Sequence, residues 1–362
     1  MDILNLKEKL SGVPDPRREW GNLRHKLVDI LVIALCSTMC CGEDFVDMEE
    51  FGRDREDWLR GFLELPNGIP DSDTFRRVLE RIEPGALSRC LNEWLEAERA
   101  HGRLVNLDGK TICGSGNSSH KAYHVVSAWV GENTLTLGEL AVDEKTNEIT
   151  AIPELLDMID IEGDVVSSDA MGCQKDIAEK IIEKGADYVL ALKGNQTSLH
   201  EDVKLYFENL RKNCDYETLE KDHGRIEKRE YFLETDIDWL AQKPDWKGLR
   251  AIGAVRSHVE EKGAVRCETR YFITTLTDTR AFADAVRGHW SIENQLHWML
   301  DVIFREDASR ARKDNSPLNL NVLRKISLSV LKRLTAGRLS VRKKMLKAAR
   351  DPDFLARLIC EK

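Results

Sequence analysis

Three polar residues at one-turn spacing mark the segment of this sequence that is best suited to chemistry. His289, Glu293 and His297 recur every four residues, which places them along one face of an α-helix. An apolar stripe accompanies them at i, i+4, i+7 and i+11: Ile292, Leu296, Met299 and Ile303. The two stripes predict an amphipathic helix across residues 290–303. A carboxylate on a rigid helix suits metal or proton chemistry, although a single glutamate on a helix is more often a solvated surface residue.

Two isolated aspartates end apolar, strand-like runs in an earlier part of the chain. Leu104-Val-Asn-Leu precedes Asp108, and Val165-Val-Ser-Ser precedes Asp169. Carboxylates are hard ligands for Mg²⁺ or Mn²⁺, and two such ions about 4 Å apart can activate water and stabilise a leaving oxygen. We therefore expect Asp108, Asp169 and Glu293 to meet and bind divalent metal ions. Zinc fits less well, because the two histidines of the HxxxExxxH pattern have no third open-site partner nearby.

The order of the apolar patterns predicts the elements that must position these acids. From Leu104 to Leu192 the chain reads as three strands, a helix, a strand, a helix and a strand. Such an order is typical of a mixed sheet flanked by helices, antiparallel at first and then parallel through crossovers. In open sheets of this kind the site lies beyond the strand ends. Asp169 would lie there, and Asp108 beside it if the first strand is central.

Four consecutive segments are predicted. Residues 1–100 have helical periodicity and form a module for DNA binding or packing, and residues 101–213 form the first part of an α/β core. Residues 214–276 are β-rich and are either an insertion or extra edge strands. Residues 277–362 carry the Glu293 helix and a basic, helical C-terminal part.

Composition restricts the class of protein. The chain has 362 residues, 42% of them hydrophobic and 32% charged, which is typical of a globular protein with a sizeable core. The apolar run 26–41 is short and contains Asp29, so we expect a core helix rather than a membrane span. The nine cysteines include no CxxC pair, which favours reduced thiols in the cytoplasm.

Charge is unevenly distributed along the chain. The net charge is −9, yet residues 305–350 contain 14 Lys and Arg against three acids. A local basic surface can bind phosphate even on an acidic protein, although a solvated helical face would have the same composition. The candidate DNA-binding residues are Lys110, Lys193, Arg225, Arg229, Arg310 and Arg312. A surface turn at Lys193 and a solvated strand edge at Arg225 and Arg229 are the alternatives.

Several of these motifs in combination resemble those of the DDE transposases of bacterial insertion sequences, and most of all the H-repeat-associated branch. The resemblance covers nearly the whole chain. It is carried by Leu107-Asp108-Gly-Lys110, Asp169-Ala-Met-Gly-Cys-Gln174, Leu192-Lys193-Gly-Asn-Gln196, His223-Gly-Arg225-Ile-Glu227-Lys-Arg229, and His289-Trp-Ser-Ile-Glu293-Asn-Gln-Leu-His-Trp298 with Phe304-Arg-Glu-Asp-Ala-Ser309.

The resemblance implies a ribonuclease H-like core interrupted by a β-rich insertion. Asp108 and Asp169 match the first two metal-binding acids of that family, and Glu293 matches the third. Related families also carry a Tyr, an Arg and a Lys around this Glu, and the corresponding positions here are Val286, His289 and Leu300. Glu306 is therefore the alternative third acid.

The implied activity is that of a Mg²⁺-dependent transposase, with Mn²⁺ as a substitute. It would cut DNA at the terminal inverted repeats of its own element and join the freed 3′ end to target DNA, as a homodimer that pairs two ends. Two alternatives remain at this stage. One is a catalytically inactive or domesticated DNA-binding relative, and the other is a different metal nuclease of the same fold.

Overall fold

The computed structural model describes residues 3–17, 23–95, 102–118, 121–132, 134–142, 148–210, 213–222, 225–261, 263–334 and 339–360. The chain forms two compact units. Unit 1 comprises Met1–Arg99, Gly109–Lys145 and Glu293–Lys362, and unit 2 comprises Ala100–Asp108 and Thr146–Ile292. Each unit combines stretches that are far apart in the sequence, whereas the four predicted segments are consecutive. The boundaries of those four segments therefore stay a prediction.

The N-terminal part of unit 1 is helical, as expected. Its helices are α1 (Ile3–Ser11), α2 (Leu27–Met39), α3 (Phe45–Asp54), α4 (Glu56–Arg60), α5 (Ser72–Arg81) and α6 (Pro84–Leu95). Carboxylates start two of them: Asp44 forms a capping box with Asp47, and Asp71 accepts the Thr74 N–H at 2.7 Å. Helix α2 is a core helix, because Asp29 is buried and accepts the Leu65 N–H at 3.0 Å. No helix among the described residues is long and apolar enough to cross a membrane.

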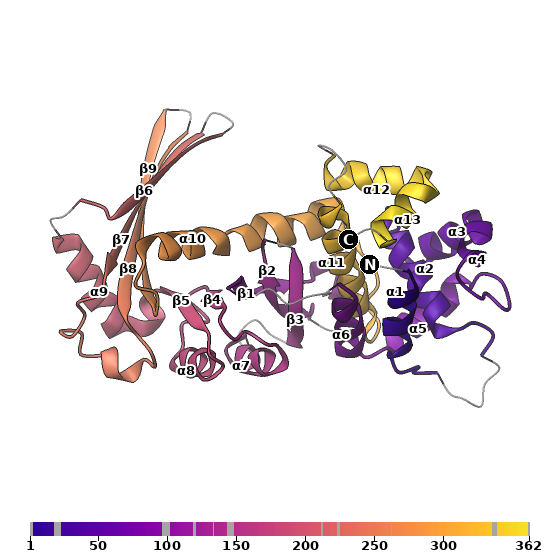
Figure 1. Cartoon of the computed structure of the whole chain (residues 1–362), viewed down its shortest axis with the longest axis horizontal. Helices are drawn as coiled ribbons and strands as arrows, with labels where there is room; N and C mark the ends of the chain where they lie inside the picture. The colour runs from indigo at the N-terminus through magenta and orange to yellow at the C-terminus, as the bar shows by residue number, and fades with distance from the viewer. Residues whose placement is uncertain are drawn as a thin grey trace. The chain divides into compact units, whose positions relative to one another are not determined.

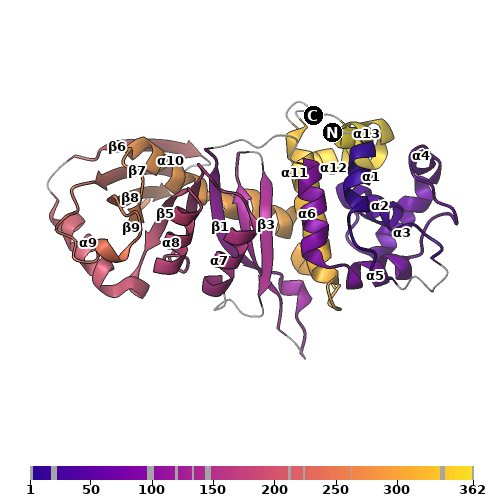
Figure 2. The ribbon, with the colours of Figure 1, turned by 60° about the horizontal axis from the view of Figure 1, so that its bottom comes forward.

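Helix α11 (Ser316–Arg333) is the centre of unit 1. It packs against α2, α5 and α6, and against β3 (Leu135–Val142) of the antiparallel β2–β3 hairpin, whose other strand is β2 (His124–Val130). Figure 2 shows α6 and α11 beside this hairpin. Two further helices, α12 (Val341–Arg350) and α13 (Pro352–Cys360), pack on α11. Because α11 is enclosed on several sides, most of its residues are buried, including Arg324 and Lys325.

Unit 2 contains the parallel strands of the prediction. Strand β1 (Leu104–Thr111) pairs in parallel with β4 (Val165–Ser168), and β4 pairs in parallel with β5 (Asp187–Leu192). Helices α7 (Glu148–Met158) and α8 (Lys175–Glu183) lie on one face of these strands. Helix α10 (Thr279–His289) lies on the other face (Figure 1). The first strand is therefore next to β4, which is the condition for Asp108 to lie near Asp169.

The β-rich region extends the same sheet. Its strands are β6 (Tyr216–Asp222), β7 (Arg225–Glu234), β8 (Ala251–Glu261) and β9 (Ala264–Thr274), and α9 (Thr197–Asn209) precedes them. Strand β9 pairs antiparallel with β5, and β8, β7 and β6 follow outward. The described strands have the order β3-β2-β1-β4-β5-β9-β8-β7-β6. This nine-stranded mixed sheet with its helices confirms the predicted α/β class, and it favours extra strands over a separate insertion body.

The core of unit 2 lies between α10 and the strands that it covers. Phe282 of α10 is fully buried and packs edge-on against Phe272, with ring centroids 5.6 Å apart. Gly253 lies beneath the Phe282 ring, where a Cβ atom would come within 2.4 Å of a ring carbon. Burial of these apolar side chains fixes α10 on the sheet. The end of α10 is therefore held at a defined place on β1 and β4.

Candidate active site

Asp108 and Asp169 extend from neighbouring parallel strands. In the β1–β4 register Leu107 pairs with Ser168. Asp169 is the first residue after β4, as predicted, whereas Asp108 does not end its strand, because β1 continues to Thr111. Both are half-buried. The carboxyl ends of parallel strands open at the same sheet edge, which is the usual place for a site in such folds. The structure therefore brings the two predicted acids of unit 2 side by side.

A tight turn after β4 orients Asp169. Its Oδ1 accepts hydrogen bonds from the backbone N–H groups of Met171 at 2.9 Å and Gly172 at 3.4 Å. A side chain at position 172 would meet Ser168, because a Cβ atom there would lie 2.0 Å from the Ser168 Oγ. Glycine is thus required at this close approach. The turn fixes the carboxylate at the strand end.

A polar chain links the end of α10 to the two acid-bearing strands. Ser167 of β4 donates its hydroxyl to Asn106 Oδ1 of β1 at 2.7 Å, and His289 Nδ1 lies 2.9 Å from the same hydroxyl oxygen. Since this hydroxyl has given its hydrogen to Asn106, the imidazole donates through Nδ1. Asn106 and Ser167 each lie two residues before one of the aspartates. His289 is therefore anchored directly below the strand ends, and it was proposed from sequence only as part of the polar stripe.

Glu293 follows His289 by four residues and is the first residue of the last part of unit 1. The segment 290–303 is largely helical, as predicted, but most of it is π-helical: α10 ends at His289, and two π-helical segments follow, Glu293–His297 and Met299–Ile303. π-Helical turns are rare in proteins, but those that occur often lie at functional sites. The Glu293 side chain is 61% exposed, and its Oε2 lies 3.5 Å from the Nδ1 of the buried His297. His297 is therefore a direct neighbour of Glu293, the predicted third acid.

Glu306, the alternative third acid, lies within a buried ion cluster of unit 1. Its side chain has no exposed surface, and its Oε1 accepts from Asn321 at 2.8 Å and lies 3.4 Å from Arg324. Lys110 approaches the other oxygen at 3.3 Å. Burial alone would raise the pKa of the Glu306 carboxyl, but Arg324 and Lys110 together lower that pKa below its usual value. Glu306 is therefore a carboxylate whose charge is balanced inside the protein.

Lys110 was predicted to bind DNA, and the structure gives its ammonium other partners. Lys110 Nζ lies 2.7 Å from Asp301, 3.3 Å from Glu306 and 3.9 Å from Asp307, and the side chain is only 11% exposed. Burial opposes the charge, yet the three carboxylates raise the pKa of Lys110 above its ordinary value. An ammonium enclosed in this way is directed toward protein carboxylates rather than toward a phosphate.

The other candidate DNA-binding residues are more accessible. Lys193 follows β5 and is exposed, as is Arg310. Arg225 and Arg229 share one face of β7, as predicted, and both pair with Glu227 between them, at 3.0 Å and 2.7 Å. His223 of the same motif lies outside the described residues.

Several of the Lys and Arg side chains in residues 305–350 are partly or fully buried. Arg312 donates from Nε to the Gly114 carbonyl at 3.0 Å. Arg324, Lys325 and Lys344 are buried, the last donating to the carbonyl oxygens of Leu331 and Leu334. The basic surface of residues 305–350 is consequently smaller than composition suggests.

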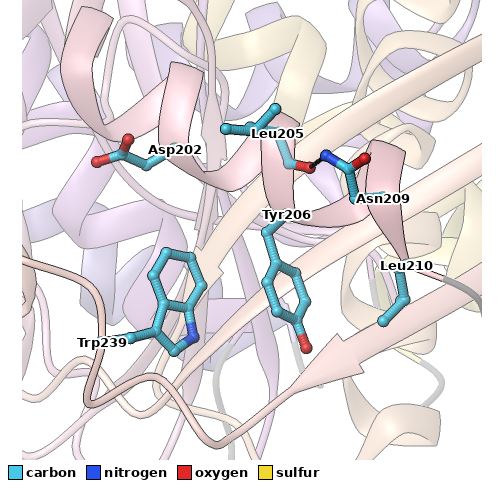
Figure 3. Close-up of a pocket in the computed structure, with 6 residues that line it drawn as sticks. All are labelled: Asp202, Leu205, Tyr206, Asn209, Leu210 and Trp239. Atoms are coloured by element: carbon cyan, nitrogen blue, oxygen red, sulfur yellow. Dashed lines mark hydrogen bonds between the residues drawn. The ribbon is translucent and has the colours of Figure 1, made fainter.

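A separate surface cavity of about 380 Å³ occurs in unit 2 (Figure 3). Tyr206 of α9 and Trp239 stack there, with ring centroids 5.1 Å apart and planes within 17° of parallel. Its six lining residues are Asp202, Leu205, Tyr206, Asn209, Leu210 and Trp239. The cavity contains none of the three predicted acids and is a feature apart from them.

Comparison with known proteins places the chain in a family. Residues 98–330 match the model described as "Transposase DDE domain", and residues 7–95 match "DDE_Tnp_1-associated". The "H repeat-associated putative transposase YhhI" of Escherichia coli K12 is 37% identical over 99% of this chain and 98% of its own length. An "Uncharacterized protein in dhlA 3'region" of Xanthobacter autotrophicus is 47% identical over 75% of this chain and 95% of its own length. An "Inactive transposase YbfQ" of E. coli K12 is 37% identical over 22% of this chain and 95% of its own length.

These matches confirm the resemblance found in the sequence motifs, over both the helical N-terminal part and the α/β part. The chain belongs to the family of DDE transposases.

Proposed function

We propose that this protein is an active, metal-dependent DNA transposase of a bacterial insertion sequence. The observation that supports the proposal is the parallel β1–β4 register in a chain of this family: Leu107 pairs with Ser168, and Asp108 and Asp169 are the residues that follow this pair. The fold would then be ribonuclease H-like. Carboxylate oxygens are the ligands that Mg²⁺ and Mn²⁺ prefer, so this pair fits such ions.

In the proposed site Asp108, Asp169 and Glu293 would hold two divalent ions. Bound Mg²⁺ would lower the pKa of a water molecule and stabilise the charge that develops on the leaving oxygen. Asn106, Ser167 and His289 hold the strand ends beneath the acids. In the first reaction a water oxygen attacks the phosphorus at the element end, and the 3′ oxygen leaves and takes up a proton. In the second, this 3′ hydroxyl attacks a target phosphodiester, and the target's own 3′ oxygen leaves.

DNA is the proposed substrate, as terminal inverted repeats and as target. Lys193, Arg225, Arg229 and Arg310 would contact phosphates through their cationic side chains. Arg312, which is half-buried, would exchange the Gly114 carbonyl for a phosphate oxygen. Arg225 and Arg229 would exchange Glu227 for phosphate oxygens, which a guanidinium fork accommodates well. We further propose a homodimer that holds two element ends, acting at the nucleoid in the bacterial cytoplasm.

The test is cleavage of a DNA duplex that carries the element's own terminal repeat, in Mg²⁺ buffer. Asp169→Asn should reduce cleavage to the level seen with chelator, because one ion loses a ligand. Asp176→Asn is the matched control, since this exposed aspartate lies on α8 of the same unit. Equal cleavage by wild type and Asp169→Asn would contradict the catalytic assignment.

An inactive, DNA-binding relative is the second candidate, favoured by the relative whose name describes it as inactive. Such a protein would bind the repeat duplex in a mobility-shift assay and leave it intact with either metal. A nuclease of another kind would instead cut duplexes without the repeat equally well and would not join strands.

A further inference from the structure

We propose that Lys110 and Glu306 are positioning residues for the metal-binding acids, acting as an internal clamp on the two chain segments that carry Asp108 and Glu293. This inference rests on the proposed function and adds a role for residues that no metal ion or DNA need touch. The clamp comprises Lys110, Asp301, Glu306, Asn321 and Arg324, all of them in unit 1.

Lys110 holds the end of β1. It lies two residues after Asp108 on the same strand, and residues at i and i+2 of a strand point to the same face. Its ammonium contacts Asp301 at 2.7 Å and Glu306 at 3.3 Å while its side chain is 11% exposed. A strand end held by such contacts cannot twist or slide without separating buried charges. The orientation of Asp108 is therefore coupled to the Lys110 contacts through a single glycine, Gly109.

Asp301 and Glu306 hold the chain that follows Glu293. Asp301 belongs to the second π-helical segment, and Glu306 follows a sharp turn at Arg305, which has the left-handed φ of 53°. That conformation is unfavourable for a residue other than glycine and persists only where surrounding contacts impose it. Arg305 pairs with Glu43 at 3.1 Å. The turn directs Glu306 inward, where the clamp holds it.

Helix α11 supplies the fixed base of the clamp. Asn321 donates to Glu306 at 2.8 Å, and Arg324 lies 3.4 Å from the same oxygen, with its own side chain 4% exposed. Separating the partners of a buried ion pair leaves uncompensated buried charges, which is strongly unfavourable. A network of buried charges on the central helix therefore suits the task of fixing two segments in one register.

The experiment compares Lys110→Met with Lys344→Met and with Lys110→Arg. Lys344 is the matched control, because it is also a buried lysine of unit 1 but donates only to backbone carbonyls at the end of α11. Lys110→Arg retains the charge. Two properties are measured on the purified full chain without DNA: the Kd for Mn²⁺ by electron paramagnetic resonance, and amide hydrogen exchange of peptides covering residues 105–112 and 293–308.

We expect Lys110→Met to raise the Mn²⁺ Kd at least about tenfold, as loss of outer partners of metal ligands does. Exchange should become faster in both peptides. Lys110→Arg should restore most of the affinity, and Lys344→Met should leave the Mn²⁺ Kd and both peptides unchanged. If Lys110→Met does not fold, Asp301→Asn removes the negative charge that lies 2.7 Å from the Lys110 ammonium, at a more exposed position, and should shift both properties in the same direction.

Two results would overturn the proposal in distinguishable ways. Saturable Mn²⁺ binding that Lys110→Met and Asp301→Asn leave unchanged would contradict the clamp and leave the transposase assignment intact. A wild-type protein without saturable Mn²⁺ binding would contradict the proposed function, and with it the metal-positioning role.

Discussion

The substitution Glu306→Gln separates the two candidates for the third acid. Gln has nearly the shape of Glu and can still accept a hydrogen bond from Asn321 through its amide oxygen. It removes the negative charge that faces Arg324 and Lys110. Lys110 retains Asp301 and Asp307 as partners, whereas Arg324 loses the carboxylate with which it pairs. The main consequence is a buried guanidinium without its counter-charge.

The magnitude follows from this burial. Removing one partner of a buried ion pair costs about 3–5 kcal/mol, and the lower end applies because the Asn321 hydrogen bond survives. At about 2–4 °C per kcal/mol for a domain of this size, the unfolding temperature should fall by about 6–12 °C. The Glu293 side chain is 61% exposed, so Glu293→Gln should change the stability by less than about 0.5 kcal/mol.

Differential scanning calorimetry in chelator-containing buffer measures both effects without any contribution from bound metal. The cleavage assay is then applied to the same variants. Glu293→Gln should abolish Mg²⁺-dependent cleavage although the protein unfolds at the wild-type temperature. The reverse pattern would refute this reasoning: a wild-type unfolding temperature for Glu306→Gln together with lost cleavage, and active Glu293→Gln. Glu306 would then be the third metal-binding acid.

Two further predictions concern stability. The pKa of the Glu306 carboxyl is lowered in the folded protein from its ordinary 4.5. The charge of Glu306 therefore stabilises the fold fully above pH 4.5, and this stabilisation is lost as the pH falls through the pKa of the folded state. The difference in unfolding free energy between wild type and Glu306→Gln should accordingly shrink in acid, and a constant difference would argue against an ionised Glu306. Gly253→Ala should cost about 1–3 kcal/mol in urea unfolding, because the new methyl group meets the buried Phe282 ring. Gly194→Ala, where a Cβ meets nothing within 4 Å, is its control, and equal stability of the two variants would contradict the tight packing of α10 on β8.

Much of the candidate site could be predicted from local sequence. Asp108 and Asp169 each follow an apolar run, and the helix between those runs requires a crossover, which implies parallel strands. The core position of α2 was likewise predictable, since apolar spacing is a local property. The four-residue spacing of His289, Glu293 and His297 was visible, but their hydrogen-bond partners were not.

The fate of individual charges could not be predicted in this way. Lys110, Arg324 and Lys344 look like surface cations in the sequence, yet Arg324 and Lys344 are buried and the Lys110 side chain is only 11% exposed. Whether a lysine meets phosphate or a protein carboxylate depends on groups far away in the chain: Glu306 follows Lys110 by nearly two hundred residues. Composition gives the number of charges in a segment but carries no information about which side chains fold inward.

The sequence by itself determined the order of strands and helices, the family, and the acids that follow two apolar runs, because each depends on short-range periodicity or on a local motif. Tertiary structure alone decided that β1 lies beside β4, that β9 continues the sheet from β5, and that Glu306 is enclosed by Lys110 and Arg324. Those outcomes depend on which distant surfaces bury apolar area and balance charge together, and only the folded chain brings such surfaces into contact.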